Sequence, residues 1–384
     1  MKRMPWETKS VENQRKAFIE AVNRSRNFSE VCRQFGITRR TGYKWLERYR
    51  NGESLNDQSR RPKHFGNKTE AKIEQSILEV RNENPGWGAN TIHTVLERSG
   101  IEYLPSVRTV NNILKRNGCI SEEESLKRKP FVRFEKDFCN EMWQGDFKGE
   151  FRMKNDAYCY PLDILDDHSR FCIALEPFPD TKDVVISTFH AAFERYGLPN
   201  SILTDNGAQF AGAHKGISRF ERWLMDLDIL PVHGRIRHPQ TQGKIERFHR
   251  TLKDELLRHK TFLDLEDAKV QLDLWRDKYN HIRPHEANGM RPPAEVYIKS
   301  SRQLPQRIEP FDYPNDLRLI KVNSWGYVRF AGFQVFLSES MADTYVGFRL
   351  SEGGDRFLVY YRNFKIAAFD TQSGQLLDRY ICKV

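Results

Sequence analysis

The spacing of apolar residues changes along this chain of 384 residues. Between residues 11 and 50, and again between residues 69 and 118, apolar side chains recur with the period of an α-helix. From residue 140 to residue 300, short apolar runs alternate with helical stretches, a pattern typical of an α/β domain. From residue 310 onward, short runs on either side of a Gly353-Gly354 turn predict a small β-barrel. The chain is therefore predicted to be multidomain.

The first helical stretch carries the signals of three short helices. Asn27 opens a capping-box signature for the second helix, and Thr38 can cap the third. Trp45, Leu46 and Tyr49 would form the inward stripe of that third helix. Three short helices are typical of an all-α helix-turn-helix unit, in which the third helix reads a DNA groove, but they also suit a generic bundle. The second helical stretch predicts another unit of this kind.

The distribution of charge favours DNA binding over the generic bundle. The chain has a net charge of +10, and residues 1 to 68 hold 17 Lys and Arg against 7 Asp and Glu, so the whole excess lies there. Such a focused positive field favours a polyanion, and nucleic acid is preferred to a membrane because no basic amphipathic anchor is present. The cations expected to contact DNA are Arg39, Arg40, Lys44 and Arg48 on the third helix, and Arg60, Arg61 and Lys63 in the linker. For the linker cations, a solvated tether remains an open alternative.

Polar stretches without an apolar period mark the predicted domain boundaries. The predicted order is a helix-turn-helix domain at 1–50, a basic linker at 51–68, a second helix-turn-helix domain at 69–120, a linker at 121–139, a core at 140–300 and a β-barrel at 310–384. Core strands are predicted at 142–151, 159–165, 171–178, 201–204 and 230–233, and helices at 182–196, 217–226, 240–258 and 265–279. A meander of three strands followed by strand and helix in turn predicts a mixed sheet. This order matches a ribonuclease H-like domain.

Three carboxylates lie where such a core would bring them together. Asp146 lies on the first predicted strand, Asp205 closes a later strand before an Asn-Gly turn, and Glu246 lies on a basic amphipathic helix. Each acid also has an ordinary explanation: an edge-strand acid, a turn former and a member of surface helical ion pairs, respectively. Three further acids compete with Asp146 and are expected on the second strand and its turn, namely Asp163, Asp166 and Asp167. The joint occurrence of the first three, in this order, favours catalysis.

Clustered carboxylates require cations, because like charges at close range raise one another's pKa. Oxygen ligands without a neighbouring His/Cys cluster favour Mg²⁺ or Mn²⁺ over zinc. Two such ions about 4 Å apart can stabilise the attacking and leaving oxygens of an in-line displacement at phosphorus. We expect Asp146 to bridge both ions, and Asp205 and Glu246 to complete one each. The cations expected to bind phosphate around Glu246 are Lys244, Arg247, Arg250 and Lys253.

The motifs around these acids resemble those of insertion-sequence transposases with a retroviral-integrase-like Asp-Asp-Glu core. The matching segments are Trp143-Gln-Gly-Asp146, Leu165-Asp-Asp-His-Ser-Arg170, Thr204-Asp-Asn-Gly207, His238-Pro-Gln-Thr-Gln-Gly-Lys-Ile-Glu-Arg247 and Tyr279-Asn-His-Ile-Arg-Pro-His285. The resemblance is strong over residues 140–295, weaker over the N-terminal helices and only architectural in the C-terminal region. It implies a DNA transposase that binds the terminal inverted repeats of its element, cleaves the ends and joins the 3′-hydroxyls to target DNA. It also implies a homo-oligomer in a paired-end complex with double-stranded DNA.

Two other functions stay open from the sequence. A catalytically inactive, domesticated transposase would act as a DNA-binding regulator, whereas a ribonuclease H-like nuclease would explain the acids but not two DNA-reading units. Six cysteines without Cys-x-x-Cys spacing are typical of reduced thiols. The chain starts without a signal-peptide core, and no run of about 18 apolar residues follows. We therefore expect a soluble, cytoplasmic, nucleoid-associated bacterial protein with no membrane partner.

Overall fold

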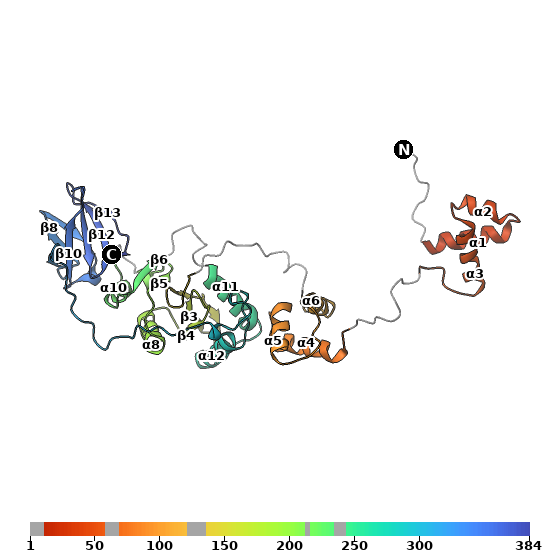
Figure 1. Ribbon diagram of the computed structural model, residues 1–384, viewed down its shortest axis with the longest axis horizontal. Coiled ribbons are helices and arrows are strands. Elements are labelled where there is room, and N and C mark those ends of the chain that lie inside the picture. Colours follow the sequence, from red (N-terminus) through yellow and green to blue (C-terminus); the bar gives the residue numbers. More distant parts are fainter. Residues whose placement is uncertain (1–10, 58–68, 121–135, 212–215, 234–242) are drawn as a thin grey trace. The chain divides into compact units, whose positions relative to one another are not determined.

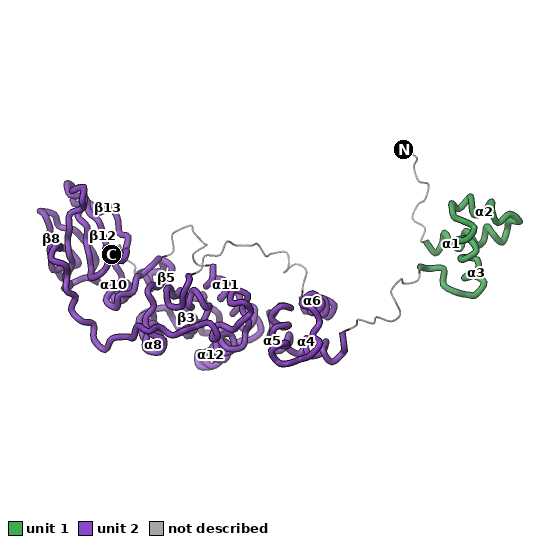
Figure 2. The backbone as a smooth tube through the Cα atoms, viewed as in Figure 1, with its two compact units in different colours: residues 1–68 green, residues 69–384 purple. Residues whose placement is uncertain are grey.

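The computed structural model of the protein (Figure 1) describes residues 11–57, 69–120, 136–211, 216–233 and 243–384. The chain forms two compact units, residues 1–68 and residues 69–384 (Figure 2). The linker cations predicted to bind DNA, Arg60, Arg61 and Lys63, lie outside the described residues. Within the described ranges, no helix combines the length and the hydropathy needed to cross a bilayer.

Three helices build the first unit: α1 (Val11–Arg24), α2 (Phe28–Gln34) and α3 (Arg39–Arg50). Both predicted caps are confirmed, because the side chains of Asn27 and Thr38 accept hydrogen bonds from backbone N–H groups three residues further on. Trp45 and Leu46 are buried as predicted. The prediction for Tyr49 is wrong: its side chain is 51% exposed, and the buried stripe of α3 ends at Leu46.

Three more helices open the second unit: α4 (Ala71–Glu83), α5 (Ala89–Arg98) and α6 (Val107–Arg116). The predicted apolar stripes meet in one core, in which Ile77 and Ile92 are fully buried. Trp87, in the turn between α4 and α5, is buried as well, and its side chain is hydrogen-bonded to the Glu255 carboxylate. Glu255 also accepts a hydrogen bond from Arg283 at 2.7 Å. The contact between Trp87 and Glu255 therefore joins the three-helix module to the following domain, in which Arg283 holds the same carboxylate.

A mixed sheet forms the centre of that domain. Its strands are β1 (Trp143–Phe147), β2 (Phe151–Arg152), β3 (Tyr158–Asp166), β4 (Cys172–Phe178), β5 (Ser201–Thr204) and β6 (Leu230–His233). β3 pairs antiparallel with β4 and β1, whereas β1, β5 and β6 run parallel, which confirms the predicted mixed sheet. The single strand predicted at 142–151 is divided, because Gly149 takes a φ of +86° and turns the chain between β1 and β2.

Helices cover both faces of this sheet (Figure 1). They are α8 (Val185–Tyr196), α9 (Ala208–Ala211), α10 (Arg219–Asp226), α11 (Gly243–Leu252), the π-helix η2 (Lys253–Leu257) that continues α11, α12 (Leu265–His281), η3 (Glu286–Asn288) and η4 (Pro293–Glu295). α8 packs on one face through Phe189, and α11 and α12 pack on the other through Phe248 and Trp275. A Cβ atom on Gly145 would lie 2.7 Å from the Phe189 ring. Glycine at this position of β1 therefore lets α8 approach closely.

The C-terminal residues form an open sheet and a hairpin. The elements are β7 (Arg318–Lys321), β8 (Tyr327–Phe330), β9 (Phe333–Phe336), η5 (Glu339–Met341), β10 (Tyr345–Leu350), β11 (Arg356–Tyr361), β12 (Phe364–Asp370), β13 (Leu376–Asp378) and β14 (Cys382–Lys383). The strand order is β13-β12-β11-β10-β7, with β14 beside β12 and β8-β9 as a separate pair. The predicted barrel is not confirmed: across residues 310–384, all of which are described, β7 and β13 remain the two unpaired ends of the sheet. The predicted Gly353-Gly354 turn does join β10 to β11.

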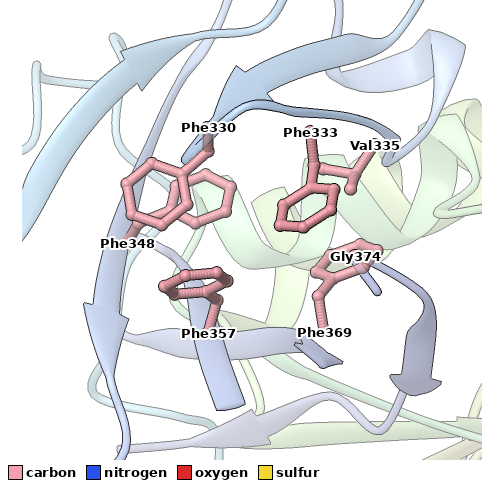
Figure 3. A pocket seen from close by; sticks show the side chains of 7 residues that line it. All are labelled: Phe330, Phe333, Val335, Phe348, Phe357, Phe369 and Gly374. Atoms are coloured by element: carbon pink, nitrogen blue, oxygen red, sulfur yellow. The ribbon is translucent and has the colours of Figure 1, made fainter. Parts of the chain in front are cut away.

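Aromatic rings fill the space between this sheet and the hairpin (Figure 3). They leave a cavity of about 10 Å³, lined by Phe330, Phe333, Val335, Phe348, Phe357, Phe369 and Gly374. That volume is close to the smallest that holds one water molecule, so this region is a packed core. The same core takes up Ile217 and Met225 from the α10 segment. Asp226 on α10 accepts a hydrogen bond from Arg362 at 3.0 Å, which joins the C-terminal sheet to the central domain.

Replacing Gly145 by alanine should lower the free energy of unfolding by roughly 1–3 kcal/mol, because the added methyl group overpacks the contact with Phe189. Urea unfolding followed by tryptophan fluorescence measures the loss, since Trp143 is buried in the same cluster. Gly243→Ala is the matched control. A Cβ atom there meets nothing within 4 Å, so stability should stay constant or rise slightly with the better helix propensity. Equal losses in both variants would contradict the close approach of α8.

Candidate active site

Two of the three predicted acids lie at the ends of neighbouring parallel strands. β1 pairs with β5 in a register that sets Gly145 opposite Thr204, so Asp146 and Asp205 are the next residues on the two strands. The negative charge of Asp205 is one cause of the raised pKa of Asp146. Asp205 Oδ1 also accepts a hydrogen bond of 2.9 Å from the Gly207 N–H. Asp205 therefore both forms the turn after β5 and lies beside Asp146.

Asp146 occupies an unfavourable position for a negative charge. Its pKa is raised to about 7, first by burial and then by the charge of Asp163, while His249 opposes the shift and Asp205 adds to it. Asp163 lies directly opposite Asp146 in the β1–β3 register. An ionised carboxylate at this position needs a compensating cation. Asp146, Asp163 and Asp205, which we call the sheet acids, thus come from neighbouring strands and act on one another through their charges.

The pair formed by Asp163 and His249 was not predicted from the sequence. The Asp163 carboxylate is fully buried, and His249 Nε2 donates a hydrogen bond of 2.6 Å to its Oδ1. Burial would lower the pKa of His249, but the charge and hydrogen bond of Asp163 raise it above its ordinary value. A signal was present in the sequence: Asp163 interrupts the apolar strand Cys159–Leu165, where a charged residue faces the core. Sequence alternation alone did not show which residue lies opposite.

Glu246 lies on α11, whose buried stripe consists of Ile245, Phe248 and Leu252, as predicted. Its own side chain is exposed. Among the described residues, no three His, Cys, Asp or Glu side chains are grouped closely enough to hold a metal ion. The structure therefore brings Asp146 and Asp205 together but leaves Glu246 apart from them. Glu246 precedes His249 by three residues, and residues at that spacing share one face of a helix.

A second histidine supports the backbone at Asp205. His233, the last residue of β6, contacts the Asp205 carbonyl oxygen through Nδ1 at 3.2 Å. Its Nε2 lies 2.8 Å from Glu221 Oε1 on α10. Burial would lower the pKa of His233, but the hydrogen bond and charge of Glu221 raise it. This bridge, which sequence analysis missed, ties the end of β5 to α10.

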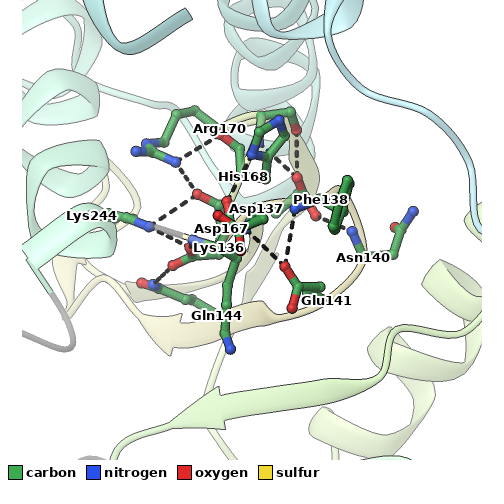
Figure 4. A network of polar contacts seen from close by, with 12 residues as sticks. Lys136, Asp137, Phe138, Asn140, Glu141, Gln144, Asp167, His168, Arg170 and Lys244 are labelled. Atoms are coloured by element: carbon green, nitrogen blue, oxygen red, sulfur yellow. Dashed lines mark hydrogen bonds and ion pairs between the residues drawn. The ribbon is translucent and has the colours of Figure 1, made fainter. Parts of the chain in front are cut away.

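Two of the three acids that competed with Asp146 in the sequence, Asp166 and Asp167, hold the end of β3 and the turn that follows it. Asp166 Oδ2 accepts hydrogen bonds from the backbone N–H and the hydroxyl of Ser169, at 2.8 and 2.6 Å. Asp167 accepts a hydrogen bond of 2.6 Å from Gln144 Nε2 and forms an ion pair with Lys244 (Figure 4). Because Lys244 lies in the first turn of α11, Asp167 ties the start of that helix to β1 and β3.

The cations predicted to bind DNA on α3 differ in exposure. The side chains of Arg39, Arg40 and Lys44 are exposed. The Arg48 side chain is only 11% exposed, lies over the Trp45 ring and forms an ion pair with Glu53 at 3.3 Å. Arg48 therefore contributes to the internal packing of this unit.

The cations around Glu246 differ in the same way. Arg247, Arg250 and Lys253 are exposed on α11 and η2. Lys244 is mostly buried against Asp167. DNA contacts by these residues remain predictions.

Comparison with known proteins identifies the domains of this chain. Two models described as integrase core domain match residues 139–239 and 227–293. A helix-turn-helix domain model matches residues 14–63, and a homeodomain-like domain model matches residues 41–114. These matches cover the mixed sheet with its helices and both helical modules.

Individual relatives point in the same direction. A protein of insertion element IS407 from Burkholderia multivorans is 22% identical over 293 residues, which are 73% of this chain and 95% of the relative. The transposase for transposon Tn552 of Staphylococcus aureus is 24% identical over 267 residues, and the chain spans about half (53%) of its length. The solved integrase catalytic core domain of HTLV-2 is 19% identical with a TM-score of 0.33, over 42% of this chain and 99% of that one. The chain thus contains an integrase core domain and helix-turn-helix domains, and it is similar to transposases and integrases of the polynucleotidyl transferase type.

Proposed function

We propose that the protein is a DNA transposase that binds the terminal inverted repeats of its own element, cleaves the ends with water and joins the 3′-hydroxyls to target DNA. The observation that carries this proposal is the adjacency of Asp146 and Asp205 at the ends of β1 and β5, within an integrase core domain. The helix-turn-helix domains would recognise the element ends, and the core would perform the chemistry. Because two ends must be cut and joined together, the active form would be a homo-oligomer in a paired-end complex with DNA.

The sheet acids have the donor chemistry that a divalent cation requires. Asp146 is a buried carboxyl with a raised pKa, and Asp163 Oδ2 is buried with no hydrogen-bond partner among the described residues. Carboxylate oxygens suit Mg²⁺ or Mn²⁺, and integrase-type cores use divalent metals. We propose that Asp146, Asp205 and Glu246 hold two such ions. When bound, the ions would stabilise the attacking and leaving oxygens at phosphorus.

Assembly of this site requires Glu246 to approach the other two acids. Asp146 and Asp205 are fixed by strand pairing, whereas Glu246 lies on the exposed face of α11. We propose that the binding of metal and DNA brings Glu246 toward the strand ends. The exposed Arg247 and Arg250 on the same helix would then contact phosphates on either side of the scissile bond.

Asp146→Asn and Glu246→Gln should each reduce end cleavage and strand transfer by at least about 100-fold, because each removes a carboxylate ligand. Binding to element-end DNA should be retained, as an electrophoretic mobility assay would show. The matched control is Glu194→Gln, which changes an exposed acid on α8. Magnesium-dependent strand transfer that survives either substitution would refute the assignment.

The metal-free protein should show a pH-dependent stability that originates at Asp146. Its folded-state pKa is about 7 and its ordinary value is 3.8, so folding becomes less favourable as the pH rises between these values. Asp146→Asn removes this penalty. Without divalent metal, the variant should therefore gain stability over the unmodified protein between pH 4 and 7, by roughly 1–3 kcal/mol.

Urea unfolding at several pH values measures this difference. Added Mg²⁺ should stabilise the unmodified protein but not the variant, since only the former keeps the ligand. Asp156→Asn, which changes an acid whose side chain is 80% exposed, should show no comparable trend. A constant difference across the pH range would contradict the burial of Asp146 among acids.

Arg39→Ala and Lys44→Ala should each weaken binding to element ends, because both side chains are exposed on the proposed reading helix. The double substitution Arg60→Ala and Arg61→Ala should reduce the salt slope of binding by roughly 2, since each phosphate contact contributes about 0.9. Fluorescence anisotropy at several salt concentrations measures both quantities. Arg33→Ala, an exposed cation on α2, is the matched control. Unchanged affinity and slope would assign end recognition to the second helical module.

A further inference from the structure

The Asp163–His249 pair connects the sheet acids (Asp146, Asp163 and Asp205) to α11, the helix that carries Glu246. Asp163 lies on β3, and strand pairing sets it directly opposite Asp146 on β1. His249 comes from α11, and its Nε2 lies 2.6 Å from Asp163 Oδ1. The side chains of His249 and Asp163 are 13% and 0% exposed, so water does not weaken this contact. The contact therefore joins α11 to the strand beside the proposed metal ligand.

Because His249 lies on α11, its hydrogen bond to Asp163 affects how that helix is rotated over the sheet. The apolar stripe of Phe248 and Leu252 holds α11 against the sheet but leaves rotation about the helix axis poorly specified. The directional hydrogen bond from His249 fixes that rotation in the middle of the helix, and the Lys244–Asp167 ion pair holds its start. Glu246 and Lys253 lie one turn before and one turn after His249, on the same side of the helix. The hydrogen bond of His249 thus sets the direction from which Glu246 would approach Asp146 and Asp205.

A role limited to supporting the fold explains these observations less well. Apolar residues could hold α11 equally well, and a buried ion pair contributes little net stability because both groups lose their hydration. The Asp163 carboxylate also adds negative charge beside Asp146 and keeps one oxygen, Oδ2, without a hydrogen-bond partner in the described part of the chain. Two carboxylates placed in this way raise the free energy of the folded protein when no cation is present, and a bound cation removes that penalty.

We infer that Asp163 and His249 are positioning residues for the metal-binding acids. Their buried hydrogen bond sets the rotation of α11 over the sheet, and thereby the access of Glu246 to Asp146. This inference rests on the proposed function, since it concerns the same two-metal site. Neither residue needs to touch DNA or metal for the effect.

Manganese binding to the full-length protein tests the inference directly. Titration with Mn²⁺, with the free ion followed by electron paramagnetic resonance, measures affinity without requiring turnover. His249→Ala should weaken Mn²⁺ binding about 10- to 100-fold, the range found when residues that orient metal ligands are removed. His249→Gln should restore most of the affinity, because its amide N–H can still donate to Asp163. His190→Ala, an exposed histidine on α8, should leave binding unchanged.

Asp163→Asn and the double variant Asp163→Asn, His249→Ala complete the comparison. If the two residues act through one contact, the loss in the double variant should not exceed that of the larger single variant. Circular dichroism and thermal unfolding of each variant identify any that do not fold. Should His249→Ala not fold, the comparison of His249→Gln with Asp163→Asn carries the test, since both preserve size.

Two results separate the inference from the proposed function. If Asp146→Asn abolishes Mn²⁺ binding while His249→Ala and Asp163→Asn bind as the unmodified protein does, the pair only supports the fold and the inference is overturned. The inference is also overturned if His249→Gln is as impaired in Mn²⁺ binding as His249→Ala. If Asp146→Asn itself binds Mn²⁺ normally, the proposed metal site is wrong, and the inference falls with it.

Discussion

Two strand pairings confine negative charge near the ends of β1 and β5. Parallel pairing places Asp146 beside Asp205, and antiparallel pairing places Asp163 opposite Asp146. Burial and mutual repulsion then raise the pKa of Asp146 to about 7. A fold that served stability alone would not collect acids in this way. A cation held by these carboxylates, as in the function that we propose, would compensate this charge.

Polar contacts that each involve a carboxylate hold the helix that carries Glu246 at its start, in its middle and in its π-helical continuation. Lys244 pairs with Asp167 at its start, and His249 binds Asp163 in its middle. In the π-helix that continues it, Glu255 binds Arg283 and the Trp87 side chain of the second helical module. A π-helical turn is a frequent feature of functional sites, and here it directs Glu255 toward that module. The second helical module is therefore in direct contact with the π-helix that continues α11.

Sequence periodicity predicted the elements of this fold much better than their contacts. The strands at 201–204 and 230–233 were predicted residue for residue, because short apolar runs bounded by turn residues are a local signal. The exposure of Tyr49 and the open C-terminal sheet were not, since both depend on what packs against a helix or strand edge. The Asp163–His249 and Glu221–His233 contacts were not predicted from the sequence for the same reason. Partners brought together by strand register and helix rotation leave no pattern in a single sequence.

Each of the three acids is tied to a different part of the molecule. Asp146 is fixed by the central sheet itself. Asp205 is linked through His233 and Glu221 to α10, and α10 is bound to the C-terminal sheet through Asp226. Glu246 is linked to the second helical module through its helix, which continues into η2, where Glu255 contacts Trp87. Both of these partners lie outside the central sheet, so Asp205 and Glu246 are each connected to a different neighbouring part of the chain. In the function that we propose, DNA bound to these two parts would act on different acids, and the metal site would be completed only when the substrate engages both.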